Sequence, residues 1–536
     1  MTKANHAIAY FCMEYGLHHS MPVYSGGLGV LAGDIVKTAH DQNRNFVAIG
    51  MFWSEGYTIQ TIDNDGIPVD TYAPTTREYV EPTNIKIPVT IRGKDIEVTA
   101  YKVKAFGCCP LYLLEPVDPE DRWITKRLYG GDDEDRVAQE VLLGVAGVRF
   151  VQALKQKQGG KTSTYHFNEG HALFGAFELM NQKMALGTEF KQAWKETKAE
   201  VVFTTHTPVP AGNEIHPIDR LFRQGADLGR FTREMLTEIG GDPFEMTPAA
   251  LRLSRAANGV AALHARTASD MWAHVDEAPS IIPITNGVHL PTWQSKTLSK
   301  AAKEGNTSAL WRKHQTLKLT LIDEIEQRNG VRLKEDTLLV GFARRAATYK
   351  RAALIFTDLE WLEPLLKDGR LQIVFSGKAH PKDTEGKAVV AKLVSMAARY
   401  PCAVVFLENY EMRLGALLTR GCDVWLNNPI RPREASGTSG MKAAANGVLN
   451  VSILDGWWDE GCQHGVNGWQ FGDGYQGKGA DEHDLAAMQQ IISDEVLPTY
   501  YDNRETWVSM MIASISSAES LFSARRMVNR YFDELY

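Results

Sequence analysis

Residues 338–343 read LLVGFA and are followed directly by RRAATYKR, residues 344–351. Six apolar residues in a row, bounded by a strongly charged segment, are typical of a strand that is buried on both faces of a parallel sheet. Four similar runs follow, each with room for a helix between them: LQIVFSG from 371, CAVVFL from 402, DVWLN from 423 and VLNVSI from 448. This alternation predicts a parallel sheet covered by helices, with right-handed βαβ connections.

The same alternation occupies the first half of the chain, in AIAYFC from 7, FVAIGMF from 46, TYHFN from 164, EVVFTTH from 200 and IIPITNG from 281. Residues 86–103 break the rhythm, because two strand-like stretches surround a turn-forming RGKD, and they predict an antiparallel hairpin. The last 32 residues lack Gly and Pro and predict one or two closing helices. We therefore expect an α/β protein with doubly wound domains over 1–290 and 291–500 and closing helices over 501–536.

The composition limits the class of protein. The 536 residues are 44% hydrophobic and 23% charged, which is ordinary for a globular chain of two or three domains and excludes intrinsic disorder. A net charge of -7 provides no overall attraction to nucleic acid or to an anionic membrane. The 6 cysteines contain no CxxC pair, so neither a disulfide framework nor a metal site is predicted. No run of about 18 apolar residues occurs, and we expect a cytoplasmic protein.

Two glycine-rich or basic segments follow predicted strands. In YSGGLGVLAGD, residues 24–34, Gly26, Gly27 and Gly29 let the backbone approach a ligand and present amides at a helix start, which suits phosphate, although glycines also serve tight turns without a ligand. In RRAATYKR, four cations are gathered at a strand end, which is costly unless an anion lies among them: Arg344, Arg345, Lys350 and Arg351. The alternative for the basic segment is a solvated helix start.

The most specific segment is EASGTSGMKAAANG, residues 434–447. Lys442 lies there in the first turn of a short Ala-rich helix, where a cation opposes the helix dipole. A phosphate would compensate both, or the lysine would be neutralised covalently as a Schiff base. An exposed lysine is the alternative.

Polar residues also end other strand-like runs, namely His206 in THTPVPAG, Glu169 and His171 in NEGHALFG, and Asn286 in ITNGVHLPTW. Side chains at strand ends can bind sugar hydroxyls, although a single histidine is more often a structural group. Two doubly wound domains that face each other would place such strand ends on both walls of one cleft.

Taken together and in this order, SGGLG, THTPVP, TNG, YKR, ENY and EASGTSGMK resemble the α-glucan phosphorylases, which act on glycogen, starch or maltodextrin. The similarity spans roughly residues 8–460 and is that of a short member of the family. The resemblance implies a glycosyltransferase of the GT-B fold. It also implies cleavage of a terminal α-1,4-glucosidic bond by inorganic phosphate, giving glucose 1-phosphate with retention. The implied cofactor is pyridoxal 5'-phosphate, and homo-oligomers are left open.

The resemblance assigns a role to each matching residue. Lys442 would hold pyridoxal phosphate as a Schiff base, with Thr438, Arg344, Tyr410 and Gly27 also near the cofactor. Arg345 and Lys350 would bind the substrate phosphate, and they are grouped with His206 and Lys442 as catalytic residues. The remaining positions would bind substrate: Leu28, Gly29, His171, Asn286, Glu434, Ser436 and Gly437.

Three positions depart from the family pattern. Arg344 stands where the long enzymes have a lysine, which keeps the charge but changes a point donor into a fork. Glu411 stands where they have an arginine for the cofactor phosphate, and Arg413 is a candidate to restore that charge. The loop LYGGDDEDRVAQE from 128 is shorter than its counterpart in the long enzymes, so the resemblance assigns no gating role to Asp132 or Asp133.

Two other readings compete. A nucleotide-sugar-dependent glycogen or starch synthase shares the two-domain fold, the GGL loop and a paired Arg/Lys, but it has no evident need for Lys442 in GTSGMK. A non-enzymatic glucan-binding protein would keep aromatic residues for sugar rings, including Trp457 and Trp458, but has no reason to gather four cations.

Overall fold

The computed structural model describes residues 7–536, and its contacts divide the chain into two compact units. Unit 1 contains the described residues up to Tyr57, together with Tyr72–Thr285 and Met527–Tyr536. Unit 2 contains Thr58–Thr71 and Asn286–Arg526. The division near residue 286 lies close to the expected one, but residues 58–71 join the second unit and the last ten residues return to the first.

Unit 1 is built on a sheet of nine strands in the order β13-β12-β9-β8-β1-β2-β7-β6-β5. The parallel strands are β1 (Ile8–Phe11), β2 (Phe46–Met51), β7 (Leu111–Pro116), β8 (Thr164–Asn168), β9 (Val201–Thr204), β12 (Ala256–Gly259) and β13 (Ile281–Pro283). The predicted hairpin is present as β5 (Val80–Ile91) and β6 (Lys94–Val103), and its second strand pairs antiparallel with β7. The hairpin therefore extends the main sheet at one edge.

The centre of this sheet is a switch point. Strand β1 lies between β2 and β8, so the chain leaves β1 toward one edge and β8 toward the other. Helix α1 (Gly27–Asp41) follows β1, and the segment from Asn168 follows β8. Ligands of open α/β sheets bind where such neighbouring connections diverge, at the carboxyl ends of the strands.

One helical stretch in unit 1 is unusually apolar. Helices α2 (Asp133–Val141) and α3 (Gly147–Lys157) are joined by a π-helical turn, Leu142–Ala146. By length and composition Asp133–Lys157 resembles a membrane span, but 83% of its most apolar window is buried within the protein. That burial is what a core helix requires. The Asp132 and Asp135 side chains form a capping box at its start.

Unit 2 contains a parallel six-stranded sheet in the order β16-β15-β14-β17-β18-β19. The strands are β14 (Leu338–Ala343), β15 (Leu371–Ser376), β16 (Val404–Leu407), β17 (Val424–Asn427), β18 (Leu449–Ile453) and β19 (Gly468–Phe471). Along β14, Leu338, Val340 and Phe342 enter one hydrophobic core, whereas Leu339 and Ala343 enter the other. Because successive side chains point to opposite faces, a continuous apolar run is what a strand between two helical layers needs.

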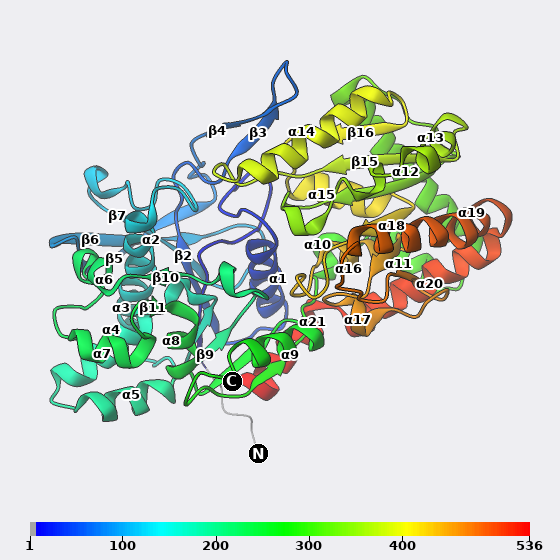
Figure 1. Cartoon of the computed structure of the whole chain (residues 1–536). Helices are drawn as coiled ribbons and strands as arrows, with labels where there is room; N and C mark the ends of the chain where they lie inside the picture. Colours follow the sequence, from blue (N-terminus) through cyan, green and yellow to red (C-terminus); the bar gives the residue numbers. More distant parts are fainter. Residues whose placement is uncertain (1–6) are drawn as a thin grey trace. The chain divides into compact units, whose positions relative to one another are not determined.

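Helices cover both faces of this sheet (Figure 1). One core includes side chains from α11 (Lys296–Lys303), α13 (Leu359–Lys367), α14 (Thr384–Arg399), α18 (Ala480–Ile491) and α20 (Arg504–Leu521). The other core includes side chains from α12 (Thr307–Asn329) and α15 (Met412–Gly421). The predicted mixed α/β architecture with parallel sheets is therefore confirmed.

The short hairpin β3 (Ile59–Ile62) and β4 (Pro68–Thr71) belongs to unit 2 although it interrupts the sequence of unit 1. It lies beside α14 (Figure 1). Gln60 forms two hydrogen bonds with the Ala379 backbone, donating to its carbonyl at 3.1 Å and accepting from its amide at 2.9 Å. This pairing, over 319 positions of sequence, explains why the hairpin docks there.

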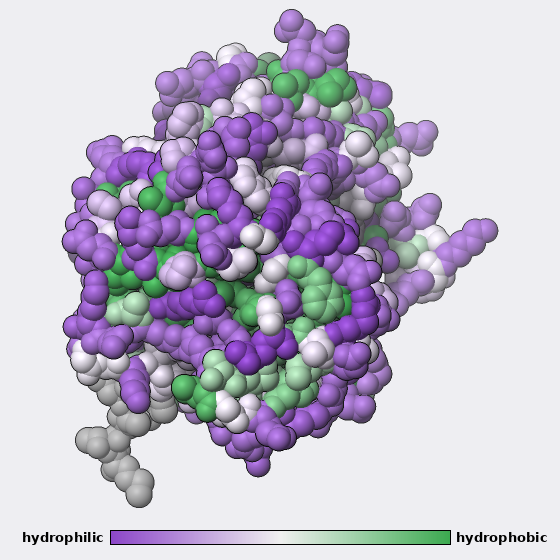
Figure 2. Space-filling view, turned by 90° about the vertical axis from the view of Figure 1, so that its left-hand side faces the viewer, coloured by the Kyte–Doolittle hydropathy of each residue, from purple (hydrophilic) through white to green (hydrophobic). Residues whose placement is uncertain are grey.

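The end of the chain forms α20 and α21 (Ala524–Arg530), as expected for closing helices. The last residues then pack on unit 1, where the Tyr536 hydroxyl lies 2.7 Å from Nδ1 of His166. On the face drawn in Figure 2, hydrophilic side chains predominate and hydrophobic ones form several small groups.

Candidate active site

The predicted basic and glycine-rich segments of unit 2 meet at the switch point of its sheet. The segment from Arg344 follows β14, and the segment that contains Glu434 follows β17. These strands are neighbours, and the chain leaves them toward opposite edges. The topology therefore brings together, at the carboxyl ends of two strands, residues that are about 90 positions apart.

Glu434 is the centre of this cluster. Its Oε2 accepts hydrogen bonds from Lys350 Nζ at 2.7 Å and from Arg344 Nη1 at 3.0 Å. Burial alone would raise the pKa of Glu434, but the charges of Lys350, Arg344 and Arg345 hold it at about 2. The carboxylate is therefore ionised at neutral pH. The cluster gathers three cations around one carboxylate, which leaves an excess of positive charge for a bound anion.

Arg345 is the exposed member of the cluster. Together with Arg344 and Lys350 it lines a small cavity, whose other lining residues include Ser376 and Gly377 at the end of β15. Arg345 and Lys350 therefore lie at the same edge of the sheet, and their role as phosphate ligands stays a prediction.

The loop that leads to Lys442 is held in a fixed shape. Asp455 Oδ2 accepts from the Glu434 amide at 2.9 Å, and the Ser436 carbonyl accepts from the Trp457 amide at 3.0 Å. Gly437 has φ +76°, a conformation that side-chain-bearing residues rarely adopt. The loop residues Glu434, Ser436 and Gly437 thus belong to the same rigid turn.

Lys442 lies on α16 (Ser439–Ala444), for which Thr438 is the N-cap residue. The side chain is buried, and its ammonium nitrogen lies 3.8 Å from the centroid of the Trp293 ring. The sequence alternative, an exposed lysine, is wrong. Lys442 lies in the last turn of this six-residue helix and not in its first turn, as the sequence had suggested. A buried amine beside an aromatic ring is a suitable attachment point for a cofactor that carries an aldehyde and a phosphate.

The region after β16 corrects one expectation. Arg413 does not restore charge at the site, because both of its terminal nitrogens bind Glu324, at 2.8 and 2.7 Å. Glu411 caps α15 by accepting from the Leu414 and Arg413 amides. The Glu411 carboxylate is therefore engaged by the backbone amides at the start of α15. Tyr410 precedes this cap, and burial raises its pKa to about 12.

Lys378 is a cation that the sequence interpretation missed. It follows β15, and its Nζ donates to the Thr58 carbonyl at 2.8 Å. Burial lowers the pKa of Lys378 to about 8, while Glu411 and Asp70 act in the opposite direction. The sequence could have indicated Lys378, because it follows the apolar run LQIVFSG just as Arg344 follows LLVGFA.

Asn286 is also buried in unit 2. Its carbonyl accepts from Arg526 at 2.9 Å. Its side-chain oxygen is buried and has no hydrogen-bond partner within residues 7–536. Such an atom requires a further donor, so Asn286 suits the predicted substrate-binding role.

In unit 1, the glycine-rich turn before α1 surrounds the buried Glu14, which the sequence interpretation did not single out. Glu14 accepts from the Ser25 amide at 2.5 Å and from the Tyr129 hydroxyl at 2.7 Å. A Cβ at Gly29 would lie 2.6 Å from the Glu14 carboxylate, so only glycine fits there. No side chain of the described residues caps α1, which leaves the amides of Gly27 and Leu28 for a ligand.

The second group in unit 1 lies at the ends of β8 and β9. His206 Nε2 lies 2.7 Å from Asn168 Oδ1, and the His206 amide donates to Glu169. Burial lowers the pKa of His206 to about 3 and that of His171 to about 4, so both rings are neutral at pH 7. Nδ1 of His171 is buried without a hydrogen-bond partner in the described part of the chain.

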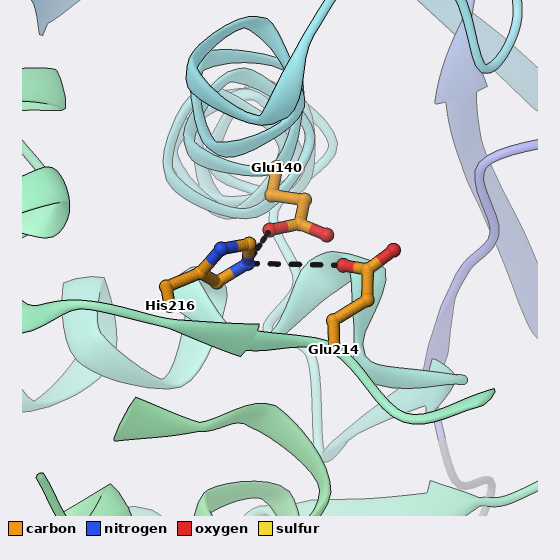
Figure 3. Close-up of side chains that lie close together, drawn as sticks. All are labelled: Glu140, Glu214 and His216. Carbon is orange, nitrogen blue, oxygen red and sulfur yellow. Dashed lines mark ion pairs between the residues drawn. The ribbon is translucent and has the colours of Figure 1, made fainter. Parts of the chain in front are cut away.

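A nearby cluster of Glu140, Glu214 and His216 has the spacing of metal ligands (Figure 3). His216 Nε2 lies 3.6 Å from Glu140 and 3.9 Å from Glu214. However, Arg136 donates to Glu214 at 2.6 Å, and Arg220 Nη1 lies 3.4 Å from His216 Nδ1. Since these arginines supply the counter-charge, we interpret the cluster as a charge network that joins α2 to β10 (Ile215–His216).

The site residues thus fall into two sets. Gly27, Leu28, Gly29, His171 and His206 lie in unit 1, whereas the basic cluster, Asn286, Tyr410 and residues 434–442 lie in unit 2. Most members of each set lie at the carboxyl edge of their own sheet, but Asn286 follows β13, a strand of the unit 1 sheet.

Comparison with known proteins places this arrangement among enzymes of carbohydrate metabolism. Residues 284–460 match the carbohydrate phosphorylase family model. A maltodextrin phosphorylase of Thermococcus litoralis is 38% identical over 100% of this chain and 71% of its own length. A glycogen phosphorylase of Aquifex aeolicus is 34% identical over 99% of this chain and 86% of its own. An uncharacterized protein of Methanocaldococcus jannaschii is 34% identical, covering 98% of this chain and 99% of itself.

Proposed function

This chain belongs to the carbohydrate phosphorylase family, and we propose that it is an α-glucan phosphorylase whose phosphate chemistry takes place at the basic cluster of unit 2. It cleaves the terminal α-1,4-glucosidic bond of a glycogen, starch or maltodextrin chain with inorganic phosphate. The product is α-D-glucose 1-phosphate, with retention of configuration. The observation that carries this proposal is the convergence of Lys350 and Arg344 on the buried Glu434, beside the helix that bears Lys442.

The cluster suits an inorganic phosphate. Lys350 and Arg345 provide one point charge and one planar fork, and charge-assisted hydrogen bonds to phosphate are about twice as strong as neutral ones. Without a ligand, Lys350 is held by Glu434. We propose that a phosphate takes over this cation during the reaction and stabilises the positive charge that develops at the anomeric carbon.

Pyridoxal 5'-phosphate fits the residues around Lys442. The lysine is buried and contacts Trp293, and the turn before it contains Gly437 and Thr438. We propose that Lys442 bears the cofactor and that Arg344 and the amides after Thr438 hold its phosphate. When bound, that phosphate supplies a group that exchanges a proton with the substrate phosphate.

The remaining residues bind the sugar. Asn286 offers a buried side-chain oxygen without a partner among the described residues, and Ser436 and Gly437 offer the edge of a rigid turn. We propose that these residues and Glu434 bind glucosyl hydroxyls from unit 2, while His206 and His171 do so from unit 1. These roles accord with the GT-B glycosyltransferase fold that we propose for the chain.

The reaction is tested by incubating the purified protein with maltodextrin and inorganic phosphate and measuring glucose 1-phosphate. Activity that depends on ADP-glucose or UDP-glucose instead would establish a synthase. The cofactor is tested by borohydride reduction and peptide mapping. We expect the adduct on Lys442, and Lys378 is the internal control, because its pKa of about 8 makes it a reactive competitor. An adduct on Lys378, or on no lysine of active protein, would overturn the cofactor assignment.

A further inference from the structure

We propose that Asn168 and Glu169 are positioning residues that hold His206 by its ring and by its backbone, so that Nδ1 of His206 is presented as a hydrogen-bond acceptor for a sugar hydroxyl. The proposal rests on the proposed function in one respect, namely that His206 faces the glucosyl group. The arrangement of the three residues rests on geometry within unit 1 alone.

The sheet register brings these residues together. Strands β8 and β9 are parallel neighbours, and Asn168 is paired with Thr204 at their carboxyl ends. The next residues of both strands therefore leave the sheet side by side. Asn168 is the last residue of β8 and Glu169 follows it, whereas His206 follows β9.

Asn168 controls the ring of His206. Asn168 Oδ1 lies 2.7 Å from Nε2 of His206, and the Asn168 Nδ2 group donates to Cys12 Sγ at 3.2 Å. Asn168 and Cys12 are both buried, and the contact of Nδ2 with Cys12 leaves the amide oxygen for the His206 ring. Since an amide oxygen only accepts, Nε2 of His206 must carry a proton.

The imidazole ring of His206 is neutral and therefore carries one N–H group. Burial lowers the pKa of His206 to about 3, and three further imidazoles, those of His264, His166 and His171, act in the same direction. A neutral imidazole has one donor and one acceptor. Because Nε2 is the donor, Nδ1 is left as an acceptor at every pH at which the protein functions.

Glu169 controls the backbone of His206. Its carboxylate accepts from the His206 amide, and from the Thr207 hydroxyl at 3.1 Å. Glu169 itself has φ 71° and ψ 173°, a conformation that is sparsely populated except by glycine. A glutamate in a glycine conformation persists only where its contacts determine it. Its carboxylate is directed at protein donors, so Glu169 positions His206 and does not itself bind the sugar, as the sequence had suggested it might.

The tautomer is tested by ¹⁵N NMR of protein with labelled histidine, with His206→Asn used to assign the signal. We expect wild-type His206 to remain a neutral Nε2–H tautomer from pH 5.5 to 8. In Asn168→Asp, the carboxylate keeps the acceptor but favours imidazolium, so the pKa of His206 should rise by about one to three units. A wild-type Nδ1–H tautomer, or an unchanged titration in Asn168→Asp, would overturn the proposal.

Kinetics give the second readout. Asn168→Leu should lower kcat/KM for maltodextrin about tenfold or more, because the ring then populates both tautomers, whereas stabilisation of the protein by inorganic phosphate should be unchanged. The activity of Asn168→Asp should recover as the pH rises, because the imidazolium of His206 then loses a proton. Normal kinetics in Asn168→Leu would refute the positioning role.

The matched control is Asn258→Leu. Asn258 is a buried amide in the neighbouring strand β12, and it binds Thr204, not His206. The Asn258→Leu variant should be less stable than the wild type but should keep the His206 tautomer. The comparison therefore separates the positioning of His206 from a general loss of packing. Since the NMR experiment needs no glucan, a protein with the expected tautomer but no phosphorolysis would refute the proposed function and not the positioning of His206.

Discussion

Substitution of Glu434 by glutamine removes a buried charge and keeps the shape of the side chain. The carboxylate holds Lys350 at 2.7 Å and Arg344 at 3.0 Å, and the pKa of Glu434 is about 2. A depressed pKa means that the ionised carboxylate stabilises the fold above the unfolded value of about 4.5, and that this contribution is lost as the pH falls through 2.

The magnitude follows from the shift. A fall from 4.5 to about 2 is about 2.5 units, and one unit corresponds to about 1.4 kcal/mol, so Glu434→Gln should lose about 3 kcal/mol at pH 7. Domains of this size lose about 2–4 °C of Tm per kcal/mol, so Tm should fall by roughly 6–12 °C. Near pH 3 the difference between the two proteins should shrink to less than half.

Inorganic phosphate should stabilise the variant more than the wild type. In Glu434→Gln, Lys350 and Arg344 have lost their carboxylate, and a phosphate supplies the missing charge. Phosphorolysis should nevertheless fall, because the amide cannot replace the carboxylate toward the sugar. Thermal unfolding with and without phosphate, on protein purified with its cofactor, measures both effects.

Asp455→Asn is the matched control. Asp455 is a buried carboxyl on the adjoining turn that binds the Glu434 amide, but burial raises its pKa to about 7. Its charge therefore costs stability at high pH, and the amide should be neutral or stabilising at pH 8. Equal loss of stability in both variants, or equal stabilisation of Glu434→Gln and wild type by phosphate, would refute the electrostatic account.

Three further predictions concern single side chains. Burial raises the pKa of Glu169 from 4.5 to about 7, so ionisation of Glu169 destabilises the fold as the pH rises through this range. The free energy of unfolding of Glu169→Gln, measured with urea, should therefore exceed that of the wild type by up to about 3 kcal/mol at pH 8 and should equal it at pH 4. Arg413→Ala should leave activity unchanged and lose about 1 kcal/mol of stability, because Arg413 is about half exposed and Glu324 keeps a second partner in Arg328. Glu411→Ala should lose about 0.5–2 kcal/mol, because Glu411 is an N-cap. Paired measurements of stability and rate would contradict this account if Arg413→Ala were inactive. Arg344→Ala should lose the cofactor and the activity together, because the cofactor phosphate loses a charge-assisted hydrogen bond worth about 1.5–3 kcal/mol. If the dialysed variant kept the absorbance of the cofactor, the assignment of Arg344 to the cofactor phosphate would be wrong.

Local patterns in the sequence predicted most of the parallel strands and the basic cluster, but they did not predict β7, β12 or β19. LLVGFA predicted a strand buried on both faces, and its side chains do divide between two cores. The cations after it were recognised because gathered charges require an anion, and the turn before Lys442 was recognised because a cation at a helix start opposes the helix dipole. Period and position along one strand are properties of a few consecutive residues, so they can be read without the fold.

Tertiary structure alone decided the pairings between distant residues. Arg413 was a plausible substitute for a missing charge until its partner proved to be Glu324, on another helix. The hairpin of residues 59–71 docks on Ala379 through Gln60, and the last residues dock on unit 1 through Tyr536. A hydrogen bond of this kind depends on two backbones converging across hundreds of residues. Neither segment carries that information in its own composition, and for this reason the sequence predicts which residues are available while the packed fold selects which of them meet.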